Sequence, residues 1–305
     1  MFSEILQTPI IKIEDKQIKT FGVELFIKRE DLTDQYISGN KYRKLKYNLI
    51  YARENNYKTL LTFGGAYSNH IHAVAYAGHK FGFKTIGVIR GDEIHPLNPT
   101  LKDASAFGMI FKYISRTEYR NKDDISVIKE LEKQFGEFYL IPEGGSNAFA
   151  VKGCTEILGE YEKTFDHICC ACGTGGTIAG LISSLKGSKR VWGFPVLKNG
   201  GFLKSDISRL IYDYNSSVYD NWKLILDYHF GGYAKHTAEL IYFINQFKKL
   251  HQIQLDPIYT GKLLFGIYDK ISAGFFKPKD RILAIHTGGL QGINGFNKRF
   301  GNLIT

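Results

Sequence analysis

The chain has 305 residues, a length that accommodates two domains or one large α/β unit. Its composition is that of a globular protein, with 44% hydrophobic and 23% charged residues. A formal net charge of +10 would suit a protein that binds nucleic acid, but the lysines are dispersed and form no continuous basic helix. We therefore expect a solvated positive surface with some attraction for anionic ligands, and no nucleic-acid partner.

Apolar runs and cysteines indicate the compartment. No apolar run approaches the roughly 20 residues that a membrane span requires, and no amino-terminal signal sequence is visible. The chain has four cysteines, Cys154, Cys169, Cys170 and Cys172, and the last three lie close together in one apolar segment. That spacing suits neither a zinc site nor disulfides, so we expect buried reduced thiols and no metal. A soluble cytoplasmic protein without a membrane partner fits these features.

The first half of the chain begins with extended segments and then alternates between strand and helix. Extended segments are expected at 10–13, 18–21 and 23–28, followed by a polar loop at 31–39. Apolar residues at helical spacing predict a helix at 41–55. Further strands are expected at 59–63, 85–89, 109–114 and 138–141, and further helices at 70–81, 99–107, 125–135 and 148–162.

The second half continues the alternation. Strands are expected at 167–171, 190–194 and 281–285, and helices after 177 to 185, at 206–214, at 235–251 and from 262 to 273. Strands separated by helices predict parallel sheets covered on both faces. We expect an α/β fold with two parallel-sheet, three-layer domains. The small domain would span 47–150, set into a large domain formed by 1–46 and 151–305.

Lys41 is a candidate for covalent chemistry. It follows a Gly-Asn pair that suits a sharp turn, and it would sit in the first turn of a helix. Neighbouring cations at Arg43, Lys44 and Lys46 disfavour its ammonium form and leave the amine freer to attack a carbonyl. Such a lysine could hold an aldehyde cofactor as a Schiff base. A basic, solvated first turn is the alternative interpretation.

A glycine-rich loop after the 167–171 strand is the clearest anion site. Its backbone amides and the start of the following helix suit a phosphate, in the run Gly173, Thr174, Gly175, Gly176 and Thr177. A dinucleotide fingerprint is an alternative, but the spacing is not G-x-G-x-x-G, and no well-placed acidic residue follows about 20 residues later. An ordinary tight turn between strand and helix is the third interpretation.

Polar side chains follow two further glycine pairs. Ser68, Asn69 and His70 open a helix after one pair, where they could bind a carboxylate or a phenolic oxygen. Thr287 ends the last strand beside another pair and could bond a heterocycle nitrogen. In both places a simple helix cap is the alternative. Because ligands bind at the carboxyl ends of parallel strands, all these loops make sense around one shared ligand.

Taken together, the loops resemble those of the pyridoxal-phosphate enzymes of the tryptophan-synthase-β fold type, also called fold type II. More narrowly, they resemble the branch that holds D-cysteine desulfhydrase and 1-aminocyclopropane-1-carboxylate (ACC) deaminase. The resemblance covers nearly the whole chain and rests on the segments 39–45, 64–70, 143–147, 173–177, 256–262 and 286–289. It implies a pyridoxal 5'-phosphate cofactor, a small amino-acid substrate and a homodimer.

The same resemblance implies roles for individual residues. Lys41 would carry the cofactor and move the Cα proton, and the 173–177 loop would hold the phosphate. Substrate and cofactor oxygens would be bound by Ser68, Asn69 and His70. Tyr259 would stack near the cofactor ring. Tyr233 matches a second active-site tyrosine more loosely, because the family's Gly-Tyr-Gly-x-Pro is here Gly-Tyr-Ala-Lys-His.

Two positions separate the branches of this family. ACC deaminases have a glutamate after the tyrosine of Asp-Pro-x-Tyr and a leucine after the last strand's histidine. In this chain these two positions are Thr260 and Thr287, as in desulfhydrases. We expect Thr260 near the substrate and Thr287 at the cofactor. A hydroxyl leaves the pyridine nitrogen neutral, which suffices for a thiolate leaving group. The sequence therefore predicts a D-cysteine desulfhydrase, with ACC deaminase or a non-catalytic pyridoxal-phosphate binder as alternatives.

Overall fold

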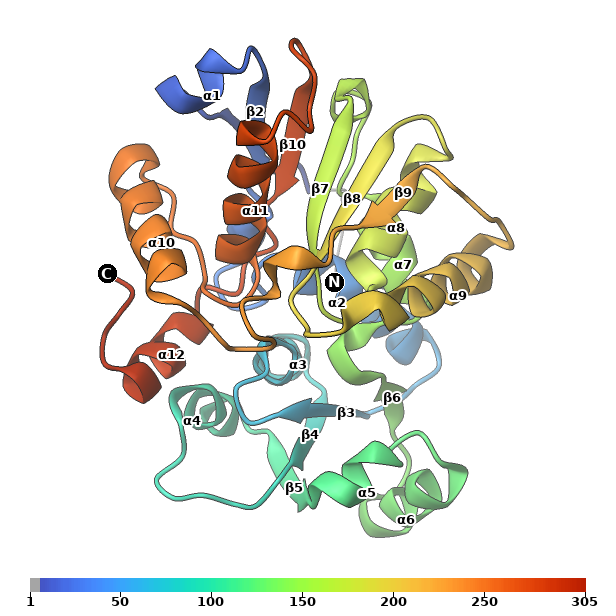
Figure 1. Ribbon diagram of the computed structural model, residues 1–305. Helices are drawn as coiled ribbons and strands as arrows, with labels where there is room; N and C mark the ends of the chain where they lie inside the picture. Colours follow the sequence, from blue (N-terminus) through green and yellow to red (C-terminus); the bar gives the residue numbers. More distant parts are fainter. Residues whose placement is uncertain (1–5) are drawn as a thin grey trace.

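Two parallel β-sheets organise the computed structural model, which describes residues 6–305 (Figure 1). The larger sheet has the strand order β1-β2-β10-β7-β8-β9 and the smaller sheet the order β5-β4-β3-β6. Strand β1 (Ile10–Lys12) runs antiparallel to β2 (Glu24–Lys28), and every other pair is parallel. The remaining strands of the larger sheet are β7 (His167–Cys172), β8 (Arg190–Pro195), β9 (Trp222–Leu224) and β10 (Arg281–Ile285). The smaller sheet comprises β3 (Thr59–Gly65), β4 (Lys84–Arg90), β5 (Ile110–Ile114) and β6 (Tyr139–Ile141).

Helices cover both faces of each sheet, which confirms the predicted α/β class. Those of the first half are α1 (Lys16–Thr20), α2 (Asn40–Glu54), α3 (Asn69–Phe81), α4 (Pro99–Ala106), α5 (Arg116–Arg120) and α6 (Ile125–Phe135). Those of the second half are α7 (Ala148–Thr155), α8 (Gly176–Leu185), α9 (Leu203–Asn215), α10 (Ala238–His251), α11 (Thr260–Ser272) and α12 (Gly292–Phe300). Short 3₁₀ turns occur at Glu30–Leu32, Glu143–Gly145, Glu162–Thr164, Gly200–Phe202 and Asp227–His229.

Strand β7 shows why the larger sheet is buried on both sides. Successive side chains of a strand point to opposite faces. Cys169 and Ala171 belong to the core on the α10 and α11 side, whereas Cys170 and Cys172 belong to the core on the α7, α8 and α9 side. All four cysteines of the chain are buried and free, as the sequence predicts. Burial is the main cause that raises the pKa of each thiol.

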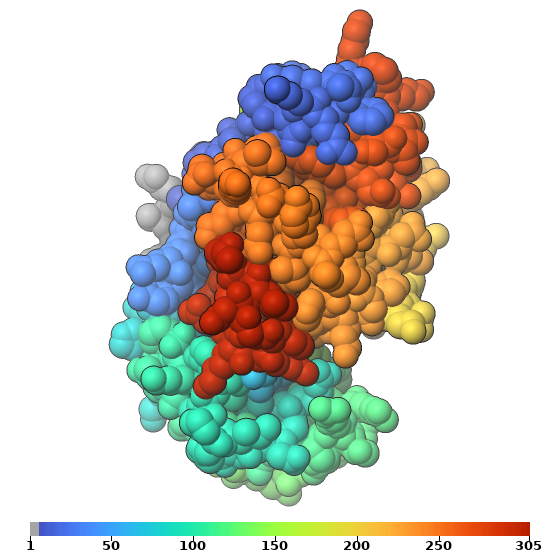
Figure 2. Space-filling model, turned by 60° about the vertical axis from the view of Figure 1, so that its left-hand side comes forward, coloured from blue at the N-terminus to red at the C-terminus, as the bar shows by residue number. Residues whose placement is uncertain are grey.

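The carboxyl-terminal helix α12 bridges the two sheet layers. In Figure 2 this red segment lies between the orange residues above it and the teal residues below it. Gly295 on α12 approaches the loop after β3 so closely that a Cβ there would lie 2.8 Å from Tyr67 Cδ1. The helix also packs against α4 of the smaller layer. A segment from the end of the chain thus helps to fix how the two layers meet.

Several predicted elements differ from the structure. Residues 18–21 are not extended, because Asp15 accepts a hydrogen bond from Gln17 N at 2.8 Å and starts the helical turn α1. The helix predicted at 148–162 ends at Thr155. Helix α10 begins three residues later than predicted, since the Thr237 hydroxyl accepts from Leu240 N at 3.3 Å and caps it. Helices α5 and α12 and strand β9 had no predicted counterpart.

The domain boundaries stay a prediction. The strands of the smaller sheet all fall between Thr59 and Ile141, and those of the larger sheet lie on either side of that range. The proposed boundary after residue 46 lies inside α2, which packs against both α7 and α3. Across residues 6–305, no helix combines the length and the apolar character needed to cross a membrane.

Candidate active site

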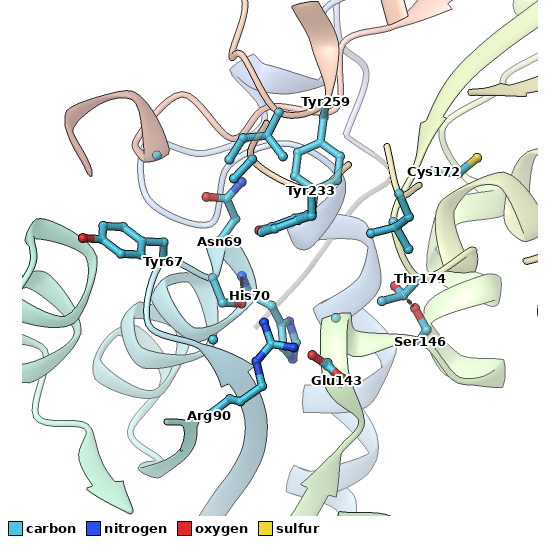
Figure 3. Close-up of a pocket in the computed structure, with 18 of the residues that line it drawn as sticks. Tyr67, Asn69, His70, Arg90, Glu143, Ser146, Cys172, Thr174, Tyr233 and Tyr259 are labelled. Carbon is cyan, nitrogen blue, oxygen red and sulfur yellow. Dashed lines mark hydrogen bonds between the residues drawn. The ribbon is translucent and has the colours of Figure 1, made fainter. Parts of the chain in front are cut away.

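A cavity of about 1090 Å³ lies where the carboxyl ends of the two sheets face each other (Figure 3). The segments that follow β3, β4, β6 and β7 all contribute to its lining. This is the position at which parallel α/β sheets bind ligands. The cavity brings together most of the site residues predicted from the sequence, namely Lys41, Ser68, Asn69, His70, Gly173, Thr174, Gly175, Thr177, Tyr233 and Tyr259.

Gly39 allows Lys41 to enter this cavity. It precedes helix α2 with a φ of +69°, which favours glycine. A Cβ at Gly39 would lie only 1.9 Å from the carbonyl oxygen of Thr287. That same oxygen accepts a hydrogen bond from Asn40 N at 3.2 Å. The start of α2 is therefore pressed against the loop after β10, and Lys41 follows directly.

The Lys41 amine lies in an environment that disfavours its charge. Its Nζ donates to Asn40 Oδ1 at 3.0 Å. Burial, followed by the charge of Lys44, lowers the pKa of Lys41 to about 7. The prediction that Arg43 and Lys46 also lower the pKa of Lys41 is wrong. Arg43 forms an ion pair with Glu30 and Lys46 with Glu156, each at 2.8 Å. A large share of Lys41 is thus neutral near pH 7, the form that reacts with a carbonyl.

Lys44 is a buried cation whose partners are neutral oxygens. Its Nζ donates to Gly144 O at 2.9 Å, to Ser146 Oγ at 2.9 Å and to Thr174 Oγ1 at 3.3 Å. The two hydroxyls lie 2.6 Å apart, as the dashed line in Figure 3 marks. Among residues 6–305, no carboxylate forms an ion pair with Lys44. Its positive charge is therefore left uncompensated at the wall of the cavity.

The start of helix α8 adds a second attraction for an anion. Gly175 has a φ of +80°, and a Cβ at Gly176 would lie 2.8 Å from Ser146 Oγ and 3.0 Å from Lys44 Nζ. Asn40 Nδ2 donates to Thr177 Oγ1 at 2.8 Å and ties the loop to the start of α2. A helix amino terminus next to an uncompensated ammonium is a strong anion site. The structure thus favours the anion-binding interpretation of this loop.

Ser68 and Asn69 occupy the first turn of α3. The Ser68 hydroxyl accepts from His70 N at 3.2 Å and from Ile71 N at 3.3 Å, so it does cap the helix. Its own proton stays available to an acceptor in the cavity. Asn69 reaches toward the loop after β10, where a Cβ at Gly289 would lie 2.7 Å from its Nδ2. Both side chains can therefore meet a ligand that the 173–177 loop holds from the other side.

His70 presents an unpaired nitrogen acceptor. The Thr62 hydroxyl donates its one proton to Ile141 O at 2.8 Å, so it accepts from His70 Nε2, also at 2.8 Å. The proton is thus on Nε2, and Nδ1 is a buried acceptor without a partner among residues 6–305. Burial, then the charges of Lys41 and Lys44, holds the pKa of His70 well below its usual value.

Two tyrosines project into the cavity from the side of the larger sheet (Figure 3). The Tyr233 and Tyr259 rings are 6.2 Å apart and nearly perpendicular, at 72°. A Cβ at Gly173 would lie 3.2 Å from Tyr259 Cε1, so the glycine makes room for this ring. Burial, then the neighbouring Tyr233, raises the pKa of Tyr259 well above its usual value. Tyr259 therefore keeps its proton and can donate it.

Three predicted residues lie behind the lining rather than in it. Thr260 is fully buried, and its hydroxyl donates to Asp256 Oδ1 at 2.7 Å and accepts from Asp256 N at 2.8 Å. Thr287 is also buried and contributes its carbonyl oxygen to the start of α2. Gly176 likewise lies just behind the lining.

Sequence reasoning missed Arg90 and Glu143, which line the cavity from the ends of β4 and β6. It also gave Lys44 no role of its own in the site. The strand-end position of Arg90 and Glu143 was a usable signal. So was the spacing of Lys44, which lies one helical turn after Lys41.

Comparison with known proteins decides the family. The family model described as "Pyridoxal-phosphate dependent enzyme" matches residues 1–288 of this chain. The chain belongs to that family. It is a pyridoxal-phosphate-dependent lyase or deaminase with the fold type II architecture. In this light the uncompensated Lys44 and the glycine loop fit the phosphate of the cofactor, and the neutral Lys41 amine fits its aldehyde.

Relatives in this family carry two names. A Thermotoga maritima protein, provisionally named an ACC deaminase, is 34% identical over 295 residues, which is 92% of this chain and 93% of the relative. The mitochondrial bifunctional D-cysteine desulfhydrase/ACC deaminase of Arabidopsis thaliana is 33% identical over 302 residues, covering 89% of this chain and 74% of the relative. A solved ACC deaminase homologue has a TM-score of 0.84 at 30% identity, covering 98% of this chain and 94% of that one.

Proposed function

We propose that this enzyme is a D-cysteine desulfhydrase, which converts D-cysteine and water into pyruvate, hydrogen sulfide and ammonia. One observation carries the proposal: hydroxyl residues stand at 260 and 287, and the carboxylate of Asp256 beside Thr260 is fully engaged. Asp256 Oδ1 accepts from the backbone and hydroxyl of Thr260, and Oδ2 accepts from Ile258 N and Tyr259 N, all at 2.7 to 2.9 Å. This carboxylate binds the backbone amides of Tyr259 and Thr260 at the start of helix α11 and does not line the cavity.

This arrangement favours the loss of a good leaving group. Pyridoxal phosphate, when bound, would draw electrons from the substrate Cα, and it would do so less strongly if no carboxylate reached its ring nitrogen. Position 260 offers no such carboxylate, because a threonine bound to Asp256 stands there. A thiolate on Cβ leaves readily under such conditions. A cyclopropane has no leaving group of that kind, so opening its ring requires a stronger pull. The pair of threonines therefore supports elimination from D-cysteine over ring opening of ACC.

The protonation states assign roles to the chain's own residues. With a pKa of about 7, Lys41 can accept the Cα proton at its Nζ near neutral pH. The Ser68 hydroxyl retains a proton for the substrate carboxylate, and Asn69 lies beside it. Tyr259 holds its proton firmly, so with Tyr233 it provides a hydroxyl donor for the departing sulfur.

The substrate proposal is tested by the products. The purified enzyme is offered D-cysteine, L-cysteine and ACC, and sulfide, pyruvate and 2-oxobutanoate are measured separately. We expect sulfide and pyruvate from D-cysteine, with kcat/KM for ACC lower by roughly tenfold or more. The Lys41→Ala variant is the control and should form no product. A kcat/KM for ACC equal to or above that for D-cysteine would overturn the assignment.

ACC deamination is the second candidate, and the names of the relatives favour it. A non-catalytic pyridoxal-phosphate carrier is disfavoured, since Ser68, Asn69 and Tyr259 all line the cavity and supply polar groups that could bind a substrate. We further propose a homodimer that works in the cytoplasm. Light scattering on the purified enzyme checks the first part, and a monomer at working concentration would contradict it.

A further inference from the structure

The segment that presents Tyr233 is an unusually strained loop. It lies between the 3₁₀ turn at Asp227–His229 and helix α10. Four of its residues have left-handed backbones, with φ of +51° at Phe230, +89° at Gly231, +122° at Gly232 and +55° at Ala234. Residues with a Cβ disfavour this conformation, so neighbouring structure must hold the loop in place. Its internal backbone bonds include Gly232 N to His229 O at 3.0 Å.

A buried lysine on helix α11 reaches into this loop. Lys262 is 1% exposed, and its Nζ donates to His229 O at 2.9 Å and to Gly232 O at 2.8 Å. Gly232 directly precedes Tyr233. Among residues 6–305, no carboxylate forms an ion pair with Lys262, and burial lowers its pKa to about 8. Burying an ammonium group whose only partners are backbone carbonyls lowers the free energy of unfolding. A lysine at this position therefore needs an explanation in its local contacts.

We propose that Lys262 is a positioning residue that fixes the 229–235 loop so that Tyr233 meets Tyr259 in the cavity. Both tyrosines are then placed by one helix. Tyr259 immediately precedes α11 in the chain, and Tyr233 is tied to the third residue of α11 through Lys262. The two rings, seen together in Figure 3, are 6.2 Å apart. The inference rests on the proposed role of Tyr233, but the first test below needs no substrate.

The first test measures how firmly the loop is held. Lys235 is exposed in the loop, so trypsin can cut the peptide bond after it. The cofactor-loaded enzyme and its Lys262→Met variant are digested under limiting conditions, and the cut is located by mass spectrometry. We expect cleavage after Lys235 to be roughly tenfold faster in the variant. The control Lys249→Met, an exposed position on α10, should leave the rate unchanged. Equal rates for wild type and Lys262→Met would overturn the proposal.

A graded variant separates positioning from general destabilisation. Lys262→Gln keeps one amide group that can donate to a loop carbonyl, so its cleavage rate should fall between those of wild type and Lys262→Met. We expect both variants to melt within a few degrees of wild type, because each removes an unpaired buried charge. If neither variant folds, Lys262 serves the whole fold and the proposal is wrong.

A double-mutant cycle tests whether Lys262 acts through Tyr233. Lys262→Met should lower kcat/KM by roughly tenfold in the wild-type background and by less than about twofold in a Tyr233→Phe background. The same factor in both backgrounds would contradict the proposal. If Tyr233→Phe itself leaves kcat/KM unchanged, the proposed catalytic role of Tyr233 is wrong. The trypsin experiment then still tests whether Lys262 positions the loop.

Discussion

Lys44 lies one helical turn after Lys41 on α2, and its charge adds to burial in lowering the pKa of Lys41 to about 7. The two lysines at the start of this helix therefore suit different roles. Burial lowers the pKa of Lys44 as well, but its Nζ donates to neutral oxygens at the cavity wall and is suited to attract an anion, whereas Lys41 is suited to react with a carbonyl. Neighbouring cations that are already paired, such as Arg43 with Glu30, have no such effect.

Removing the Lys44 charge should raise the pKa of Lys41. In Lys44→Met, we expect the pH midpoint for capture of free pyridoxal by the apoprotein to shift above that of wild type, which should lie near pH 7. Pyridoxal without its phosphate is used so that the lost phosphate contact does not interfere, and capture is followed by visible absorbance. Lys46→Met is the control, because Lys46 is paired with Glu156 at 2.8 Å and should not move the midpoint.

Lys41 should also make the stability of the apoprotein depend on pH. Its pKa is lowered to about 7 in the folded state from 10.5, so between these values the unfolded chain binds one more proton. The free energy of unfolding then rises with pH across this window, and below pH 7 the full penalty is present. Lys41→Met removes the penalty, so it should stabilise the apoprotein more at pH 6 than at pH 9. Urea denaturation at both pH values checks this, and an equal gain at both would contradict it.

The fold was predictable wherever apolar periodicity was long. Buried strands such as His167–Cys172 and helices such as Asn40–Glu54 show it, and the structure places them close to the predicted bounds. Short elements escaped because a single contact decides them. The turn at Lys16–Thr20 depends on the Asp15 cap, and α12 contains two glycines with few apolar residues. No periodic pattern can indicate such elements before their tertiary neighbours are known.

The lining of the cavity was predictable where glycine loops follow strands, since the backbone itself forms that part. Side-chain pairing was not predictable, because the partners lie far apart in the sequence. Three cations near Lys41 looked equivalent, yet Arg43 finds Glu30 and Lys46 finds Glu156, which leaves Lys44 free to act on Lys41. The burial of Thr260 behind Asp256 was hidden for the same reason.

A substitution at Gly39 tests whether the close contact between Gly39 and Thr287 O positions Lys41 in the cavity. In Gly39→Ala, the new Cβ would lie 1.9 Å from Thr287 O, on a backbone with a φ of +69°. We expect a loss of about 3 kcal/mol or more in the free energy of unfolding, together with loss of the visible absorbance of the lysine-bound cofactor. Gly274→Ala is a matched control, because Gly274 has a φ of +68° and open space around it. It should lose only about 1 kcal/mol and keep the absorbance. Equal losses at the two positions would show that the contact with Thr287 is unimportant.

His70 should remain neutral, with its proton on Nε2, across the physiological pH range. The Thr62 hydroxyl fixes this tautomer, because its own proton is committed to Ile141 O. Burial and the charges of Lys41 and Lys44 oppose any second proton. Long-range ¹H–¹⁵N spectra of the labelled enzyme should show an unprotonated Nδ1 that does not titrate near pH 6.5, whereas in urea His70 should titrate near its usual value of about 6.5.

Thr62→Val supplies the decisive comparison for this tautomer. It leaves both His70 Nε2–H and Ile141 O without their partner, so we expect a loss of about 1–3 kcal/mol in the free energy of unfolding. The ring should then lose its single tautomer, because nothing selects Nε2–H over Nδ1–H in the variant. A wild-type spectrum with the proton on Nδ1 would mean that the buried, unpaired acceptor does not exist. His70 Nδ1 would then be a donor.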